Sequence, residues 1–201
     1  MTENYQSFME RCEIFFPHSE CVKISVAYKL AKFHHRFDTR KDELGPNGEP
    51  VRYFEHARRV ALIAPDELGI ADVELVILSL LHDTIEDTRL TTEEITFIYG
   101  SEISRRVMLM SKKPKQGFHK RLLDFADWKV LLVKGCDRLD NIRSLKNSPV
   151  EFQQKQIKET REMYYPLMDK LVERTPEETK LHVQMLRATL RETTETLARY
   201  K

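Results

Sequence analysis

Apolar residues recur three and four positions apart along most of this sequence, the spacing that places them on one face of an α-helix. Runs that alternate apolar and polar residues are few, and the 201 residues include only six glycines. The pattern therefore predicts an all-α bundle, and no sheet is required. A chain of this length buries roughly 70% of the surface that its unfolded form exposes. We expect a single domain over residues 1–201 that needs no disulfides.

Charge and cysteine content exclude several classes of protein. Thirty-three basic and thirty-two acidic residues leave a net charge of +1, which is too little for a non-specific nucleic-acid binder. Cys12, Cys21 and Cys136 show no CxxC spacing, which favours a reducing compartment. The most apolar stretch, residues 73–81, is far shorter than the roughly 20 residues that span a bilayer. Since the first residues also lack a signal-peptide pattern, we expect a cytoplasmic protein with no membrane partner.

The helical periodicity is interrupted once by a clear loop signal. Residues 38–51 contain two glycines, two prolines and an Asn-Gly pair, so we expect a loop there. The segment 71–87 is apolar on most sides, which predicts a central core helix. The expected helices cover residues 24–37, 53–63, 71–87, 91–100, a segment from 101, 122–145, 150–174 and a segment from 175.

The predicted core helix ends in polar residues. The sequence His82-Asp83-Thr84-Ile85-Glu86-Asp87 places four ionisable groups at the end of a buried element. Burying an uncompensated charge costs several kcal/mol, so such groups need a cation, a metal or many hydrogen bonds. Alternatively, these residues form the last turn of a helix, with their acids facing water. Helix stability does not explain three acids there, because acids at a C-terminal end oppose the helix dipole.

Two further polar features lie on other predicted helices. Lys134, Asp137 and Asn141 follow one line of the helix at 122–145, and spacing alone favours a surface pair for the first two. His56 shares a helix with apolar residues, where a lone histidine is more often a hydrogen-bonded core residue than a ligand. Taken together, however, three helices offer two imidazoles and two carboxylates. Such a mixed set suits a borderline divalent ion such as Mn²⁺.

The order of these residues resembles a known superfamily. An early histidine, an HD pair and a distant aspartate is the arrangement of the HD superfamily of metal-dependent phosphohydrolases. HDTIEDT at 82–88 and VKGCDRLDNIRSL at 133–145 are similar to the hydrolase domain of the RelA/SpoT homologue family. Arg40-Lys41-Asp42, Gly48-Glu49-Pro50 and His56 resemble that family's RKxGEPYxxHP segment. The resemblance covers about residues 27–145, and the chain resembles a stand-alone small alarmone hydrolase of the metazoan SpoT type.

The resemblance implies an HD-domain helical bundle with a metal site in its core, and an activity: hydrolysis of the 3′-pyrophosphate of ppGpp or pppGpp to GDP or GTP and pyrophosphate. It implies that four residues hold one Mn²⁺ ion: His56, His82, Asp83 and Asp137. It implies that two acids position or deprotonate the attacking water: Glu86 and Asp87. It implies that the remaining polar residues contact the nucleotide: Arg40, Lys41, Asn141 and either Lys112 or Lys113.

Several alternatives stay open at this point. Ala57 follows His56 where the family usually has proline, and the loop at 38–50 is longer than usual, which bears on substrate choice. The same site could act on NADPH, ppApp, a modified tRNA end or a nucleoside phosphate. A catalytically silent nucleotide-binding module and a purely structural bundle are further alternatives. The sequence predicts neither the oligomeric state nor the role of the C-terminal helices at 150–200.

Overall fold

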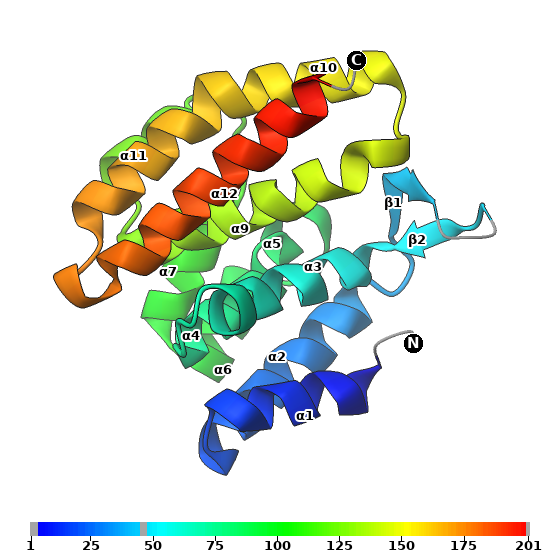
Figure 1. The fold of residues 1–201 in the computed structure, drawn as a ribbon. Coiled ribbons are helices and arrows are strands. Elements are labelled where there is room, and N and C mark those ends of the chain that lie inside the picture. Colours follow the sequence, from blue (N-terminus) through cyan, green and yellow to red (C-terminus); the bar gives the residue numbers. More distant parts are fainter. Residues whose placement is uncertain (1–3, 45–47, 200–201) are drawn as a thin grey trace.

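The computed structural model describes residues 4–44 and 48–199, of which most are helical (Figure 1). The N-terminal half contains α1 (Tyr5–Phe15), α2 (His18–His34), β1 (Thr39–Leu44), β2 (Pro50–Arg52), α3 (Tyr53–Leu62), a π-helical turn (Ile63–Glu67), α4 (Val73–Leu81), α5 (Thr84–Asp87) and α6 (Thr92–Tyr99). The C-terminal half contains α7 (Ser101–Met110), α8 (Phe118–Phe125), α9 (Trp128–Ser144), a 3₁₀ turn (Leu145–Asn147), α10 (Val150–Glu159), a π-helical turn (Thr160–Tyr164), α11 (Tyr165–Arg174), a 3₁₀ turn (Glu177–Thr179) and α12 (Lys180–Arg199). The predicted all-α bundle is confirmed.

Helix α9 lies in the middle of the bundle. It contacts α3, α4 and α7 on one side and α11 and α12 on the other (Figure 1). Its residues from Val130 to Asp140 are buried without interruption. A Cβ atom on Gly135 would come within 2.8 Å of Met168 and 3.0 Å of Leu186, so this glycine permits the close packing of α9 on α11 and α12. The predicted burial of the 73–81 segment is also confirmed, because every residue from Leu75 to Leu81 is buried in α4.

A small sheet replaces the loop that was expected at 38–51. Strands β1 and β2 pair antiparallel, with Thr39 opposite Arg52 and Leu44 opposite Pro50. Its first strand reads TRKDEL, and so it lacks the apolar alternation by which a strand is predicted from sequence. The expectation of a loop over the whole of 38–51 was therefore wrong, and the hairpin leads directly into α3.

Two predicted helices are each divided in the structure. The segment 71–87 is not one helix: α4 ends at Leu81, and α5 begins at Thr84 after a break at His82 and Asp83. Glu86 and Asp87 thus lie in a separate helix of a single turn, so the argument from the dipole of a long helix does not apply to them. The segment 122–145 is also divided, because Asp127 begins α9 by accepting a hydrogen bond from the amide of Val130, 3.0 Å away.

The N-terminal helices were the least well predicted. Helix α1 was not expected, and α2 begins at His18 and ends at His34 rather than covering 24–37. Pro17 precedes α2 and suits that position because a helix start leaves its first amides unpaired. The segment 150–174 is helical as predicted, with a π-helical turn that ends just before Tyr165-Pro166.

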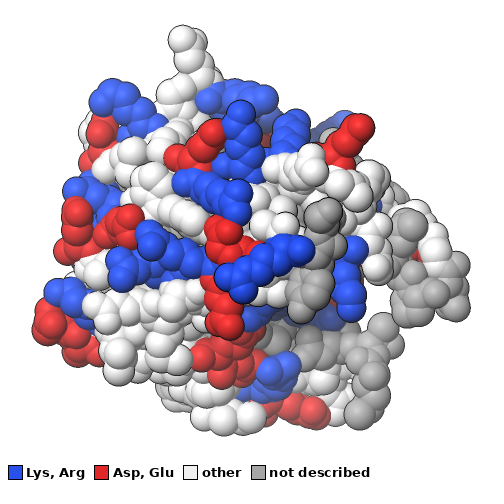
Figure 2. All heavy atoms as spheres, turned by 45° about the horizontal axis from the view of Figure 1, so that its top comes forward, with Lys and Arg blue, Asp and Glu red and all other residues white. Residues whose placement is uncertain are grey.

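The surface agrees with the balanced composition. Figure 2 shows basic and acidic side chains intermingled across one face of the molecule. All three cysteines are buried and free. Over the described ranges, no helix is both long and apolar enough to traverse a lipid bilayer.

Candidate metal centre and substrate cavity

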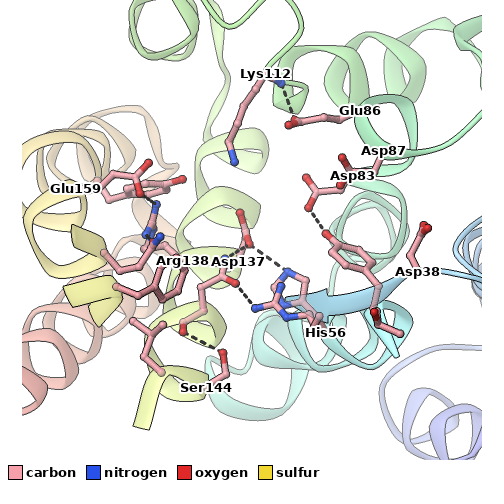
Figure 3. A pocket seen from close by; sticks show the side chains of 18 of the residues that line it. Asp38, His56, Asp83, Glu86, Asp87, Lys112, Asp137, Arg138, Ser144 and Glu159 are labelled. Atoms are coloured by element: carbon pink, nitrogen blue, oxygen red, sulfur yellow. Dashed lines mark hydrogen bonds and ion pairs between the residues drawn. The ribbon is translucent and has the colours of Figure 1, made fainter. Parts of the chain in front are cut away.

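A cavity of about 590 Å³ brings most of the predicted site residues together. Its walls come from β1, α3, α5, α9 and α10, which lie far apart in the sequence. In Figure 3, Asp83, Glu86 and Asp87 lie on one side of the cavity, and Asp137 and Arg138 lie on the other. The sequence-predicted residues that line it are Arg40, His56, Asp83, Glu86, Asp87, Lys112, Asp137 and Asn141.

Three of the four expected metal ligands converge at one point. One ligand atom from each of His56, His82 and Asp137 lies within 4.8 Å of the other two, and all three residues are buried. The Nε2 atom of His56 is 3.2 Å from Oδ1 of Asp137, and Nε2 of His82 is 3.8 Å from the same oxygen. Helix α3, the end of α4 and the middle of α9 each supply one of these side chains.

Both imidazoles are oriented with Nε2 toward this point. His56 donates from Nδ1 to Oδ2 of Asp140 at 2.7 Å, and His82 donates from Nδ1 to the carbonyl of Ser79 at 2.8 Å. Both Nε2 atoms are buried, and neither makes a hydrogen bond of regular geometry with the described residues. Each faces a carboxylate oxygen: Oδ1 of Asp137 is 3.2 Å from Nε2 of His56, and Oδ2 of Asp83 is 2.9 Å from Nε2 of His82. Imidazole nitrogens and carboxylate oxygens around one point are a donor set that a divalent metal ion can bind, so the residues fit the group.

Asp83 is adjacent to the triad but is not part of its compact group. Its Oδ2 lies 2.9 Å from Nε2 of His82 and accepts a hydrogen bond from the hydroxyl of Tyr53. Burial and the Asp83 carboxylate together raise the pKa of Tyr53 well above its usual range, so the hydroxyl stays protonated as a donor. The role of Asp83 as a fourth metal ligand stays a prediction.

Lys134 and Asp137 are not the surface pair that spacing alone favoured. Lys134 is fully buried, and its Nζ donates to Oδ2 of Asp137 at 2.7 Å. Asn141 donates from Nδ2 to Oδ1 of the same carboxylate at 2.6 Å. Burial acts to lower the pKa of Lys134, but Asp137 and Asp83 outweigh it and raise that pKa, so a buried ammonium faces the ligand cluster. The spacing argument failed because α9 is surrounded on most of its sides.

Glu86 and Asp87 have different surroundings. Oε2 of Glu86 accepts a hydrogen bond from the backbone amide of Lys112 at 2.7 Å, which fixes its position at the cavity wall (Figure 3). Partial burial, together with the carboxylates of Asp83 and Glu86, raises the pKa of Asp87 to about 6. A carboxyl group with such a pKa accepts a proton more readily than an ordinary aspartate does.

The residues expected to contact the nucleotide differ in where they lie relative to the cavity. Arg40 lines the cavity from β1 and donates from Nη2 to Oδ1 of Asn141 at 2.6 Å. The side chain of Lys112 points into the cavity in Figure 3. Lys113 is exposed and donates from Nζ to the carbonyl of Glu86. The expectation for Lys41 concerns a side chain that lies outside the described residues.

The C-terminal segment forms a wall of the cavity that sequence reasoning did not assign. Arg138 of α9 donates to Oε1 of Gln156 at 2.6 Å and lies 3.0 Å from Oε2 of Glu159. Its guanidinium carbon lies 3.9 Å from the ring centre of Tyr164. Arg138 directly follows Asp137 in the quoted motif, but nothing in the sequence shows that it would face α10. Tyr53 and Asp140 were missed as well. Their signal was their spacing, three residues before His56 and three after Asp137.

Comparisons with known proteins are consistent with this geometry. No family model matches the chain. It is 39% identical over 158 residues to a guanosine-3′,5′-bis(diphosphate) 3′-pyrophosphohydrolase of Aquifex aeolicus, covering 74% of this chain and 21% of that protein. It is 34% identical over 183 residues to GTP pyrophosphokinase rsh of Brucella melitensis (85% and 23%), and 34% identical over 170 residues to a GTP pyrophosphokinase of Myxococcus xanthus (77% and 21%). The chain thus spans about a fifth of the length of these relatives.

A solved structure resembles the fold over nearly its whole length. It is described as a metazoan orthologue of SpoT that hydrolyses ppGpp and plays a role in starvation responses. The TM-score is 0.60 at 27% identity, over 85% of this chain and 95% of that one. The sequence motifs, the converging ligand triad and these likenesses agree. The chain therefore belongs to the hydrolase-domain family of the RelA/SpoT homologues.

Proposed function

We propose that this chain is a manganese-dependent 3′-pyrophosphohydrolase of guanosine alarmones, acting as a single domain. The observation that carries the proposal is the convergence of the buried side chains of His56, His82 and Asp137 at one point beside a cavity of about 590 Å³. The names of the Aquifex aeolicus relative and of the metazoan SpoT orthologue support ppGpp as the substrate. The cytoplasmic location stays a prediction.

His56, His82, Asp83 and Asp137 would hold the ion. Two nitrogen and two oxygen donors suit Mn²⁺ better than they suit Mg²⁺, which takes oxygen ligands. When bound, Mn²⁺ supplies a lowered pKa for a coordinated water molecule and a positive charge for a phosphate oxygen.

The proposed reaction breaks the bond between the ribose 3′ oxygen and its phosphorus. The oxygen of water bonds to that phosphorus, the 3′ oxygen takes up a proton, and GDP or GTP and pyrophosphate result. Asp87, whose pKa is raised to about 6, would accept the proton of the attacking water. Glu86, fixed by the amide of Lys112, would orient that water.

Positive side chains on both sides of the cavity would bind the charged substrate. Arg40 reaches the cavity from β1 and Lys112 reaches it from the segment after α7. A guanidinium stacks on a base and pairs with phosphate, whereas an ammonium acts as a point charge. Asn141 lies between Arg40 and Asp137, so it would contact the ribose or the 3′ phosphate next to the reacting phosphorus.

One assay tests the proposal. The purified chain is incubated with Mn²⁺ and, separately, with ppGpp, pppGpp, ppApp, NADPH and GTP, and the products are separated by anion exchange. We expect pyrophosphate with GDP or GTP, no reaction in EDTA, and none with Asp83→Ala or His82→Ala. Asp124→Ala, which changes an exposed acid of α8, is the control and should be fully active.

Three outcomes would contradict the proposal. Phosphate release from NADPH without reaction of ppGpp would keep the metal site and change the substrate. Nucleotide binding without turnover would indicate a regulatory module. Full activity of metal-stripped Asp83→Ala protein would refute the metal mechanism itself. Two relatives are named as GTP pyrophosphokinases, and this chain matches about a fifth of each, so ATP and GTP are added as a further substrate pair.

A further inference from the structure

A carboxylate held by an arginine supports the ligand His56 from behind. Oδ2 of Asp140 accepts the Nδ1 proton of His56 at 2.7 Å. Arg59, one turn further along α3, binds both oxygens of the same carboxylate: Nε lies 2.8 Å from Oδ1 and Nη2 lies 3.0 Å from Oδ2. Such a two-point contact fixes the plane of the carboxylate, and the carboxylate in turn fixes the imidazole.

The same guanidinium reaches the substrate side of the site. Nη2 of Arg59 also donates to Oε2 of Glu43 at 2.9 Å, and that oxygen lies 3.5 Å from Nε of Arg40. Arg40 donates to Asn141, which donates to Asp137. Since Oδ1 of Asp137 lies 3.2 Å from Nε2 of His56, these contacts form a closed ring. The ring connects the metal ligands to strand β1.

Burial distinguishes this ring from an ordinary surface network. The side chains of Asp140 and Glu43 are 7% and 19% exposed, and that of Arg59 is 34% exposed. Truncation of Arg59 would therefore leave a nearly buried carboxylate without its two-point partner. The exposed side of Arg59 lines a second cleft of about 420 Å³, together with Glu43, Asp140 and Arg143. A small solute in that cleft can reach the position of the guanidinium.

We propose that Arg59 is a positioning residue for the metal centre and that Glu43 links it to Arg40. The inference rests on the proposed function in taking His56 as a metal ligand and Arg40 as a substrate contact. It separates two effects. Loss of Arg59 disturbs both His56 and Arg40, whereas loss of Glu43 disturbs Arg40 and leaves the pair of Arg59 and Asp140 intact.

The test measures Mn²⁺ affinity by isothermal titration calorimetry on the metal-free chain, without substrate. We expect Arg59→Ala to bind Mn²⁺ about 10- to 100-fold more weakly than the wild type, as for other partners of metal-bound histidines. Millimolar guanidinium chloride should restore much of that affinity, and the same concentration of sodium chloride should not. Arg143→Ala is the control, since Arg143 lines the same cleft but pairs with Glu67.

A second variant tests the link. Glu43→Gln should bind Mn²⁺ like the wild type, while its KM for ppGpp rises about tenfold, the effect of one weakened charged hydrogen bond. Unchanged KM together with unchanged Mn²⁺ affinity would remove Glu43 from the proposal.

Wild-type Mn²⁺ affinity in Arg59→Ala, or weakened affinity that guanidinium does not restore, would overturn the role of Arg59. If Arg59→Ala does not fold, Arg59→Lys decides, because lysine keeps the charge and cannot span both oxygens. Intermediate affinity in that variant supports the proposal, and wild-type affinity overturns it. Failure of the wild-type chain to bind Mn²⁺ would instead contradict the proposed function.

Discussion

Replacing His82 with leucine is expected to destabilise the metal-free chain, because the fully buried imidazole contacts a carboxylate as well as a backbone carbonyl. The substitution removes the 2.8 Å hydrogen bond from Nδ1 to the carbonyl of Ser79, worth about 1 kcal/mol. It also removes the imidazole whose Nε2 lies 2.9 Å from Oδ2 of Asp83, and leaving that carboxylate without this partner costs about 1–3 kcal/mol. The free energy of unfolding should therefore fall by about 2–4 kcal/mol.

Mn²⁺ should widen the difference in stability between the wild type and the variant. A ligand that binds only the folded chain adds about 2.7 kcal/mol to the free energy of unfolding at a concentration about 100 times its Kd. The wild type should gain this increment, and His82→Leu should not, because the triad loses one of its two imidazoles. His82 thus adds more stability with the metal than without it.

The assay is urea unfolding followed by circular dichroism, in EDTA and in excess Mn²⁺. His119→Leu is the matched control, since His119 donates from Nε2 to the carbonyl of Met163 at 2.8 Å and lies outside the site. It should lose about 1 kcal/mol in both media and keep the metal increment. The reasoning is refuted if His82→Leu keeps that increment, or if the metal-free variant is as stable as the wild type.

Three further predictions concern single side chains. Asp87→Asn should lower kcat by about 10²–10⁴-fold and keep the Mn²⁺ increment in unfolding experiments; loss of the increment would make Asp87 a ligand instead of a base. Arg40→Ala should raise KM for ppGpp with little change in kcat, and a change in kcat alone would argue against substrate binding there. In Asp127, burial acts to raise the pKa, but Arg106 and the amide of Val130 outweigh it, and the net shift is downward. Asp127→Asn should therefore cost about 1 kcal/mol above pH ~4, the difference vanishing as pH falls through the lowered pKa, and a pH-independent difference in urea unfolding would contradict this.

Local patterns accounted for most of the fold and failed at identifiable places. The apolar periodicity predicted the helical class and the burial of α4, because that pattern is set by which faces must leave water. It could not predict the break at His82 and Asp83, where the local sequence permits a continued helix. It also missed β1, whose polar residues pair by backbone hydrogen bonds that carry no side-chain signal.

The candidate site was also predicted from the sequence only in part. The order of His56, the HD pair and Asp137 in the sequence indicated the donor set, since these residue types bind divalent ions whatever their distance along the chain. Convergence of the triad depends on the packing of α3 and α4 against α9. The sequence did not predict the contacts of Asp140 with His56 and Arg59, or those of Arg138 with α10, because these contacts depend on how the helices pack.

By itself, then, the sequence determined the helical class, the family motifs and the chemistry of the expected ligands, because these depend on residue type and short spacing. The tertiary structure alone decided that Lys134 is buried beside Asp137, that Nε2 of each histidine faces a carboxylate oxygen, and that α10 lines the cavity. The physical reason is that burial and hydrogen-bond pairing depend on which elements pack against each side of a helix. The sequence of that helix alone does not specify those neighbours.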